Sequence, residues 1–474
     1  MPADTGKVGI LTFSDGRQAV HESLAALSRA SQARLAKSLQ LDGYQTVTGQ
    51  EIIWTNELAV AEARRLAQSA CDLTIFNFAA WAWPQFPVLA AQFAPRPLLL
   101  FSQPNPQQRG MAALLACGGS LTQIGAKHFR VCGILEDPLV RQRLRSFLDA
   151  GVCLGRLRGQ TYGLFGGRPM GITTSVPNAD QWMAQFHVDI EHIDEWEIVR
   201  RAQQIPQPEV EAAFDWCQEN VGAIHYDDKQ LTPDILKRQL ACYLAVKTMC
   251  AEKRLDFCGI KGQPELSDNW CAMDLAEALL NDPYDHQGSK EPLVCAGDAD
   301  SDGALTMQIL KSLAKTPVLA TEVRYWNNEL GIFHLSNPGQ HPTYFAGASL
   351  DPKENLSDVH LYPQGLDCPA GGALVHHLAA TGPVTLARLA RFEGDYFLTI
   401  ATGEFVRFDG KTNERLMRDA IYEWPHAFWH PDCHPEEFLG AHCPHRIHAV
   451  YGEHVAPLLH LADLLGIEPV ILSD

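Results

Sequence analysis

The middle of the chain carries an acidic segment, Cys295-Ala-Gly-Asp-Ala-Asp-Ser-Asp-Gly303, whose side chains could hold a cation or move protons. Asp298, Asp300 and Asp302 match the start of an EF-hand loop, but Ile309 stands where that loop needs a glutamate. The preceding residues have the pattern of a strand. The segment is therefore an acidic loop between a strand and a helix, where open α/β sheets bind ligands. Solvated turn aspartates, one of them capping the helix, are the alternative.

A second carboxylate, Glu322, interrupts the apolar run Val318-Leu-Ala-Thr-Glu-Val-Arg-Tyr-Trp326. A carboxylate in a buried strand needs a partner or a metal ion, because an unpaired buried charge is costly. The alternative to a catalytic role is an ion pair between Glu322 and Arg324 on one face of a sheet.

The C-terminal part is rich in histidine. Cys433, His434, His442 and Cys443 could supply four zinc ligands, but their spacing is not that of a common structural zinc site. Carboxylates combined with one histidine instead favour Mn²⁺ or a similar divalent ion. Most histidines of this part are expected to be packing residues: His426, His430, His434, His442, His445, His448, His454 and His460.

The first 150 residues alternate between short apolar runs and amphipathic segments, which predicts a doubly wound parallel sheet. The expected strands are Val8–Phe13, Leu73–Phe78, Pro97–Phe101 and Phe129–Leu135, and the expected helices are Val20–Leu41, Glu57–Ser69, Gln107–Cys117 and Leu139–Ala150.

A second α/β region follows, with apolar runs at Phe257–Ile260 and Pro292–Ala296 and a helix at Ala304–Ala314. From about residue 330, turn residues and alternating segments predict a β-rich part. We therefore expect two doubly wound parallel-sheet domains, 1–156 and 157–314, followed by a β-rich C-terminal domain, 315–474, that completes the site.

Composition narrows the class of protein. A chain of 474 residues suggests about three domains. Its 38 Lys and Arg against 56 Asp and Glu give a net charge of −18, which argues against a nucleic-acid partner. Thirteen cysteines, an odd number without a dense framework, indicate reduced thiols and the cytoplasm. The N-terminus lacks a signal-peptide pattern, and no apolar stretch reaches the length of a membrane span.

Several familiar motifs are absent from the sequence. It contains no G-x-G-x-x-G after the first strand, no G-x4-G-K-[ST], no G-x-S-x-G and no H-E-x-x-H. A nucleotide cofactor, a hydrolase nucleophile elbow and a zinc protease all become less favoured.

An ordered series of short motifs resembles the L-fucose isomerases, within the broader fucose/arabinose isomerase group. The series covers most of the chain, although no single motif in it is decisive. Its members are Asp15-Gly-Arg17, Thr74–Trp81, Gly166-Gly167, Gly259-Ile-Lys-Gly-Gln263, Asp274-Leu-Ala-Glu-Ala-Leu-Leu-Asn281, the acidic loop, Glu322-Val-Arg-Tyr-Trp326, Gly331–Asn337, Glu423-Trp424-Pro425 and Tyr451-Gly-Glu-His454.

The resemblance implies a divalent ion, Mn²⁺ or else Co²⁺ or Mg²⁺, held by a Glu, an Asp and a late His. By motif these correspond to Asp298, Glu322 and His454, so the two acid types are exchanged in this chain. The arabinose isomerases add a second histidine ligand, for which His334 is the candidate.

The resemblance also implies residues near the substrate. Arg17 and Trp81 match two of them, and the Trp is contributed across a subunit boundary. Gln263 and Trp424 match pocket residues, and Lys261 stands where the family commonly has Gln. A lysine in the pocket would favour an anionic sugar.

The implied function is an aldose–ketose isomerase that works through an enediol, with Asp298 and Glu322 moving the protons. The implied assembly is a homo-oligomer, a hexamer, with its pockets at subunit contacts. One alternative is an isomerase for a sulfonated hexose such as sulfoquinovose, suggested by Lys261. The other is a sugar-binding protein without catalysis, because doubly wound sheets also serve as sugar receptors.

Overall fold

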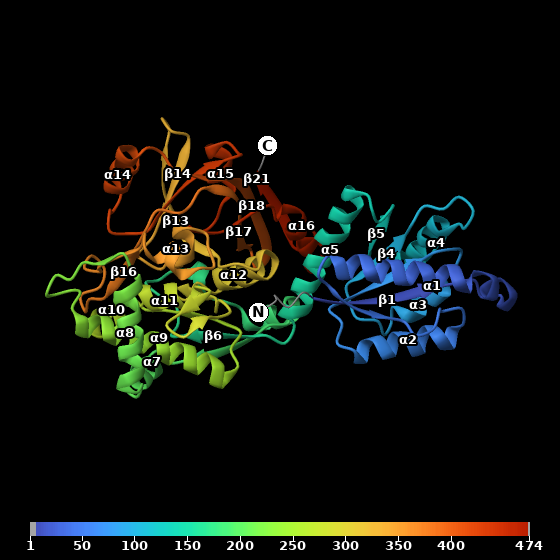
Figure 1. Ribbon diagram of the computed structural model, residues 1–474, viewed down its shortest axis with the longest axis horizontal. Coiled ribbons are helices and arrows are strands. Elements are labelled where there is room, and N and C mark those ends of the chain that lie inside the picture. The colour runs from blue at the N-terminus through green and yellow to red at the C-terminus, as the bar shows by residue number, and fades with distance from the viewer. Residues whose placement is uncertain (1–5, 473–474) are drawn as a thin grey trace. The chain divides into compact units, whose positions relative to one another are not determined.

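The computed structural model describes residues 6–472, which form two compact units (Figure 1). The first contains residues up to 158 together with 456–466, and the second contains 159–455 together with the last residues from 467 onward. The first unit therefore includes a helix that comes from almost the end of the chain.

The first unit is built around a parallel sheet of five strands in the order β2-β1-β3-β4-β5. Every residue of β3 and β4 is buried, as expected of central strands that helices cover on both faces. The strands are β1 (Lys7–Phe13), β2 (Gln45–Thr48), β3 (Leu73–Phe78), β4 (Leu98–Ser102) and β5 (Phe129–Cys132).

Two apolar clusters pack against this sheet, one on each face. The helices are α1 (Gln18–Leu41), α2 (Asn56–Gln68), α3 (Gln85–Ala90), α4 (Gly110–Gln123), α5 (Pro138–Leu157) and the late α16 (Val455–Leu465). In α16, the ring of His460 lies 4.5 Å from that of Phe129, and Lys127 donates a hydrogen bond to the carbonyl of Asp463. These contacts fix α16 beside β5 and α5.

A second parallel sheet, of four strands in the order β12-β9-β6-β7, opens the second unit. Its strands are β6 (Thr161–Phe165), β7 (Asp189–Ile193), β9 (Phe257–Ile260) and β12 (Cys295–Gly297). Its helices are α6 (Ala179–Gln185), α7 (Trp196–Ala202), α8 (Gln207–Asn220), α9 (Pro233–Lys253), α10 (Glu265–Asn269), α11 (Asp274–Asn281) and α12 (Ser301–Ala314).

The rest of the second unit is a barrel with smaller additions. Six strands follow one another in the antiparallel order β17-β20-β13-β14-β19-β18, and the pairing of β17 with β18 closes the ring, while β21 adds to β18 in parallel. They are β13 (Leu319–Asn327), β14 (Ile332–Ser336), β17 (Gly382–Phe392), β18 (Asp395–Val406), β19 (His426–Pro431), β20 (Arg446–Tyr451) and β21 (Glu468–Leu472).

The smaller elements surround the two sheets of this unit. They are β8 (Ala223–Ile224) with β15 (His360–Pro363) and β16 (Ala373–His376), the hairpin β10 (Tyr284–Asp285) and β11 (Gly288–Ser289), the 3₁₀ turns Thr173–Ser175 and Thr343–Ala346, and α13 (Pro352–Leu356), α14 (Gly410–Asp419) and α15 (Pro435–Ala441).

The predicted fold class is confirmed: two parallel sheets with helices precede a β-rich C-terminal sheet. The expected boundary at 156 lies two residues before the end of the first unit's main segment at 158, whereas the expected boundary at 314 lies inside the second unit. The three-domain division stays a prediction. None of the helices described between residues 6 and 472 combines the length and apolar character that a membrane crossing needs.

Candidate active site

Asp298 follows β12 directly and therefore lies at the carboxyl end of the second parallel sheet. Asp298 and Ala299 both have left-handed backbone angles (φ 51° and 46°), so the chain turns sharply as it leaves the strand. The N–H of Ala299 donates to the carbonyl of Ile260 at 2.8 Å, which fixes this turn against β9. The predicted position of the acidic loop at the ligand-binding edge is thus what the structure shows.

The other two aspartates of the loop attach α12 to the barrel. Asp300 caps α12 and accepts two hydrogen bonds from Arg388 of β17 at 2.5 and 2.8 Å, while Asp302 pairs with Arg391 at 2.8 Å. Burial raises the pKa of Asp300, but the Arg388 charge outweighs it and holds this pKa below its ordinary value. A Cβ at Gly303 would lie 2.5 Å from Arg388, so a glycine is needed there.

Glu322 lies opposite Arg446 in the pairing of β13 with β20. The Arg446 guanidinium forms an ion pair with Asp298, reaches within 4.0 Å of Glu322 Oε1, and donates from Nη1 to the carbonyl of Gly297 at 2.6 Å. Only 3% of the Arg446 side chain is exposed. Burial lowers the pKa of Arg446, but Asp298, Asp300 and Glu322 outweigh it and raise this pKa. The structure therefore brings the two predicted catalytic acids together around one buried cation.

Glu322 has two further neighbours. Arg324 donates to Glu322 Oε2 at 2.8 Å and lies over the ring of Trp424 at 4.5 Å. The imidazole of His445 is 3.8 Å from Glu322 Oε1, and burial together with Arg446 lowers the pKa of this histidine, so it is neutral at pH 7. The ion pair of Glu322 with Arg324, expected as an alternative, is present, and it connects Trp424 to the site.

The donor set does not fit a divalent ion in this arrangement. Two carboxylates, Asp298 and Glu322, already face two guanidiniums, Arg446 and Arg324, so the formal charges balance. Within residues 6–472, no three His, Cys, Asp or Glu side chains converge as ligands of one metal ion. A cation between Asp298 and Glu322 would have to displace the buried Arg446.

His454 does not lie with these acids. It follows the other end of β20, and its backbone N–H donates to Thr385 at 3.0 Å. From Arg446 to Tyr451 the strand advances five residues, roughly 17 Å at about 3.4 Å per residue. The structure thus separates His454 from Glu322, and His445 is the histidine beside this acid.

His334 is a packing residue of the barrel. It is fully buried in β14, where its Nδ1 is 3.1 Å from the Tyr325 hydroxyl and its Nε2 is 2.8 Å from His426 Nδ1. Burial lowers the pKa of His334 to about 4. Both ring nitrogens are therefore engaged, and the structure does not support a role for His334 as a ligand.

A small cavity of about 40 Å³ connects Asp298 with Gln263 and with two acids of α11, Asp274 and Glu277. Burial raises the pKa of Asp274 to about 7. Burial also raises the pKa of Glu277 well above its ordinary value, with Asp274 and Asp298 adding to the effect. A buried carboxyl with a raised pKa, that of Glu277, therefore lies at the same cavity as Asp298.

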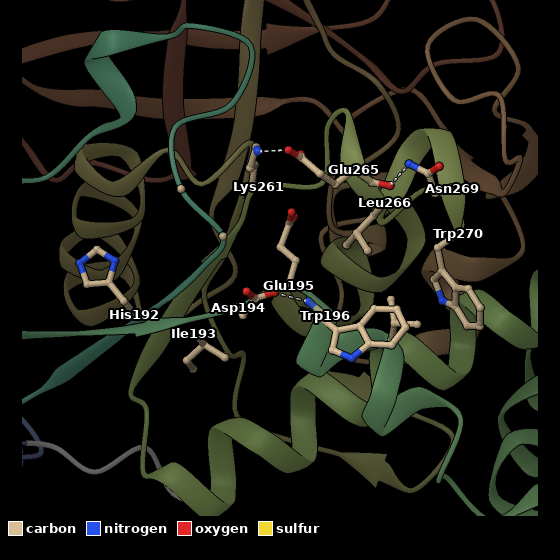
Figure 2. A pocket seen from close by; sticks show the side chains of 13 residues that line it. His192, Ile193, Asp194, Glu195, Trp196, Lys261, Glu265, Leu266, Asn269 and Trp270 are labelled. Carbon is tan, nitrogen blue, oxygen red and sulfur yellow. Dashed lines mark hydrogen bonds and ion pairs between the residues drawn. The ribbon is translucent and has the colours of Figure 1, made fainter.

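Lys261 lies between this small cavity and a larger one of about 630 Å³. Figure 2 shows its amine directed at Glu265, at a distance of 2.5 Å, with the carboxyl of Glu195 rising beside this pair. Burial raises the pKa of Glu195 to about 7. Lys261 is therefore paired with a half-exposed carboxylate, and the anionic-sugar alternative stays a prediction.

Arg17 and Trp81 belong to the first unit. Arg17 forms a two-point ion pair with Asp15 at 2.8 and 2.7 Å, and 61% of its side chain is exposed. Trp81 follows β3 and packs partly buried against the apolar cluster of that unit. Both residues lie near the carboxyl ends of β1 and β3, as expected for ligand-binding positions.

The sequence pattern did not mark four residues around these acids as site residues: Arg446, His445, Asp274 and Glu277. Glu277 could have been found from the sequence, because a lone carboxylate among Leu and Ala in Asp274–Asn281 suggests a buried charge. Arg446 could not, because its partner Asp298 is 148 residues away.

Comparison with known proteins gives the family. Three family models match: the first N-terminal domain of L-fucose isomerase over residues 5–159, the second over 247–315 and the C-terminal domain over 335–472. L-fucose isomerases from Haemophilus influenzae (strain Rd) and Citrobacter koseri are each 24% identical to this chain, over 500 and 509 residues, and cover 90% of it and 84% of their own length.

Among solved structures, a periplasmic solute binding protein from Actinobacillus succinogenes with bound D-allose covers 66% of this chain and 93% of its own. Its 13% identity and TM-score of 0.17 support no inference about fold or ligand. The three domain matches and the colinear relatives establish that the chain belongs to the L-fucose isomerase family.

Proposed function

We propose that this chain interconverts an aldose and its 2-ketose. Family membership supports this reaction, and one structural observation carries it: carboxyl groups from separate elements, Asp298 after β12 and Asp274 and Glu277 of α11, line one small cavity. Asp298 and Glu322 share the guanidinium of Arg446, and burial raises the pKa of the Glu277 carboxyl well above its ordinary value.

The reaction moves one proton from C2 to C1 and one between the two oxygens, so substrate and product have the same atoms. A carboxylate takes the C2 proton, and the enediol that forms receives a proton at C1. In our proposal Asp298 and Glu322 act as base and acid in turn, with Glu277 as a reserve proton donor. The buried guanidinium of Arg446 favours the negative charge that develops on the oxygens.

The first experiment tests the reaction in D₂O. The full-length protein is incubated with L-fucose, D-arabinose, L-arabinose and sulfoquinovose, and NMR follows ketose formation and deuterium at the exchanging carbon. We expect conversion of at least one neutral aldose with deuterium uptake, because the enediol exchanges its carbon-bound proton with solvent. Binding of a sugar without conversion or exchange would instead support the sugar-binding alternative.

Variants assign the reaction to the site. Asp298→Asn and Glu322→Gln should each lower turnover by roughly 10²–10⁴-fold, the usual contribution of a positioned acid or base. Glu404→Gln, an exposed acid on barrel strand β18, is the matched control and should leave turnover unchanged. Near-normal turnover in either site variant would refute these roles.

The other predicted properties also need direct tests. We propose a homo-oligomer, a hexamer, in which Arg17 lies near the sugar and Trp81 reaches it across a subunit contact, and light scattering would measure the mass of this assembly. The resemblance implies a requirement for Mn²⁺, Co²⁺ or Mg²⁺, which activity measured before and after chelation would test, and no step above depends on an ion. The cytoplasmic location expected from the cysteines stays a prediction as well.

A further inference from the structure

We propose that the guanidinium of Arg446 permanently occupies the position between Asp298 and Glu322 where a divalent ion would bind, so that this site holds no ion. The inference rests on the contacts of Arg446 and not on the proposed activity. This conclusion is the opposite of what the sequence resemblance implies, which is a divalent ion bound between these acids.

The contacts of Arg446 come from two separate segments. Gly297 and Asp298 belong to the end of β12 and its loop, and Glu322 belongs to β13. Arg446 therefore joins the parallel sheet to the barrel at the point where their carboxylates meet. A bound cation would make the same connection, because it too draws two carboxylates towards one centre.

Arg446 differs from the neighbouring arginines in this respect. Arg388 and Arg391 each pair with one carboxylate, Asp300 and Asp302 respectively, and so attach α12 to β17. Arg446 is the arginine shared by Asp298 and Glu322, the two acids at the small cavity and at the barrel strand beside it.

Strand pairing, a hydrogen bond and burial restrain the Arg446 guanidinium, so we do not expect it to move aside for an ion. Its strand, β20, pairs with β13 at Arg446 itself and with β17 from His448 onward, which restrains the backbone. Nη1 is bound to the Gly297 carbonyl at 2.6 Å, and only 3% of the side chain is exposed. A divalent ion placed beside it would face a fixed positive charge at short range in a buried site, where such repulsion is strong.

Charge balance leads to the same conclusion. Asp298 and Glu322 contribute two negative charges, and Arg446 and Arg324 contribute two positive ones. A divalent ion added to these four groups would leave the site with two uncompensated positive charges. If Arg446 were replaced by a small neutral residue, Asp298, Glu322 and the neutral imidazole of His445 would remain as two carboxylates and one nitrogen donor, which suits Mn²⁺.

Metal binding tests the inference without an activity assay. The full-length protein is freed of metal with a chelator and titrated with Mn²⁺, while electron paramagnetic resonance follows free Mn²⁺ and the melting temperature is recorded. The wild type should bind less than about 0.1 Mn²⁺ per chain at a concentration where Arg446→Gly binds about one. The melting temperature should rise with Mn²⁺ in the variant alone.

Two further variants make the result specific. Arg391→Gly is the matched control: it removes a guanidinium from a single carboxylate and should gain no ion. Asp298→Asn combined with Arg446→Gly should lose the ion again. If Arg446→Gly does not fold, the wild-type titration still decides, because one tightly bound Mn²⁺ that Asp298→Asn abolishes would overturn the inference.

The inference is also overturned if Arg446→Gly folds and binds no ion, since the guanidinium would then not be occupying an ion site. Its failure is distinguishable from that of the proposed function. A protein that converts no sugar but shows this pattern of Mn²⁺ binding would refute the isomerase proposal alone. An active isomerase with a stoichiometric wild-type ion would refute the inference alone.

Discussion

Glu277 is a buried carboxyl group and Asp274 a half-buried one, and both lie at the same small cavity as Asp298. Burial is the main cause of their raised pKa values, and the neighbouring carboxylates add to it. Such groups cost stability once they ionise, and raised pKa values of this kind are common at functional sites. The pH dependence of folding gives a way to measure this cost at a single residue.

For Asp274, the folded pKa of about 7 lies above the ordinary value near 4 of the unfolded chain. Between these values the folded state binds the additional proton, so the free energy of unfolding falls as the pH rises from about 4 to about 7. Asp274→Asn removes this contribution. We expect the fall between pH 4 and pH 8 to shrink by about 1–3 kcal/mol in urea titrations. An unchanged fall would mean that Asp274 ionises alike in both states.

At the scale of elements, α12 is tied to the barrel by the Asp300–Arg388 pair, whose arginine is only 1% exposed. Breaking a buried pair leaves one uncompensated charge, which is far more costly than losing an exposed pair. The helix and the strand therefore depend on each other through two side chains 88 residues apart.

Arg388→Met should lower the free energy of unfolding by about 3–5 kcal/mol, because it leaves the buried Asp300 carboxylate without its positively charged partner. Arg388→Met combined with Asp300→Asn should recover part of this loss. Arg418→Met breaks the exposed pair with Glu414 on α14 and should cost less than about 1 kcal/mol. Equal effects of Arg388→Met and Arg418→Met in urea unfolding would contradict the assignment.

The elements themselves could be predicted well from the sequence. Apolar runs and helical periodicity located β1, β3, β4 and β5 and the helices α1, α2, α4 and α5, because these patterns are local, whereas the short β2 and α3 were not expected. The position of Asp298 followed from the rule for parallel strands. The sequence did not show which histidine lies beside Glu322. His445 and His454 stand at opposite ends of β20, and only the register of β20 with β13 shows which end meets Glu322. The role of Arg446 depends on that same register.

At the scale of the whole molecule, the first unit is completed by α16, which follows almost the entire second unit in the sequence. Leu461 of this helix is 1% exposed, and His460 stacks edge-on against Phe129 and Phe147. A helix that is buried in this way forms part of the core of the first unit, although it comes late in the sequence.

Leu461→Ala should therefore destabilise the first unit by about 2–5 kcal/mol, as for other large-to-small core changes. Hydrogen exchange should accelerate in β5 and α5, while the strands of the barrel keep their protection. Leu439→Ala on α15 is the control, because that leucine is 61% exposed. Faster exchange in the barrel alone would show that α16 stabilises the second unit instead.

The late position of α16 also has a consequence for biosynthesis. The main segment of the first unit ends at residue 158, and its last helix begins nearly 300 residues later. At roughly 5–20 residues per second, about 15–60 seconds pass between the synthesis of the two parts. During this interval Phe129 and Phe147 lack the partner that covers them in the finished chain. The segment that is synthesised first therefore completes its core last. We expect it to be accessible to proteases and chaperones while the second unit is being synthesised.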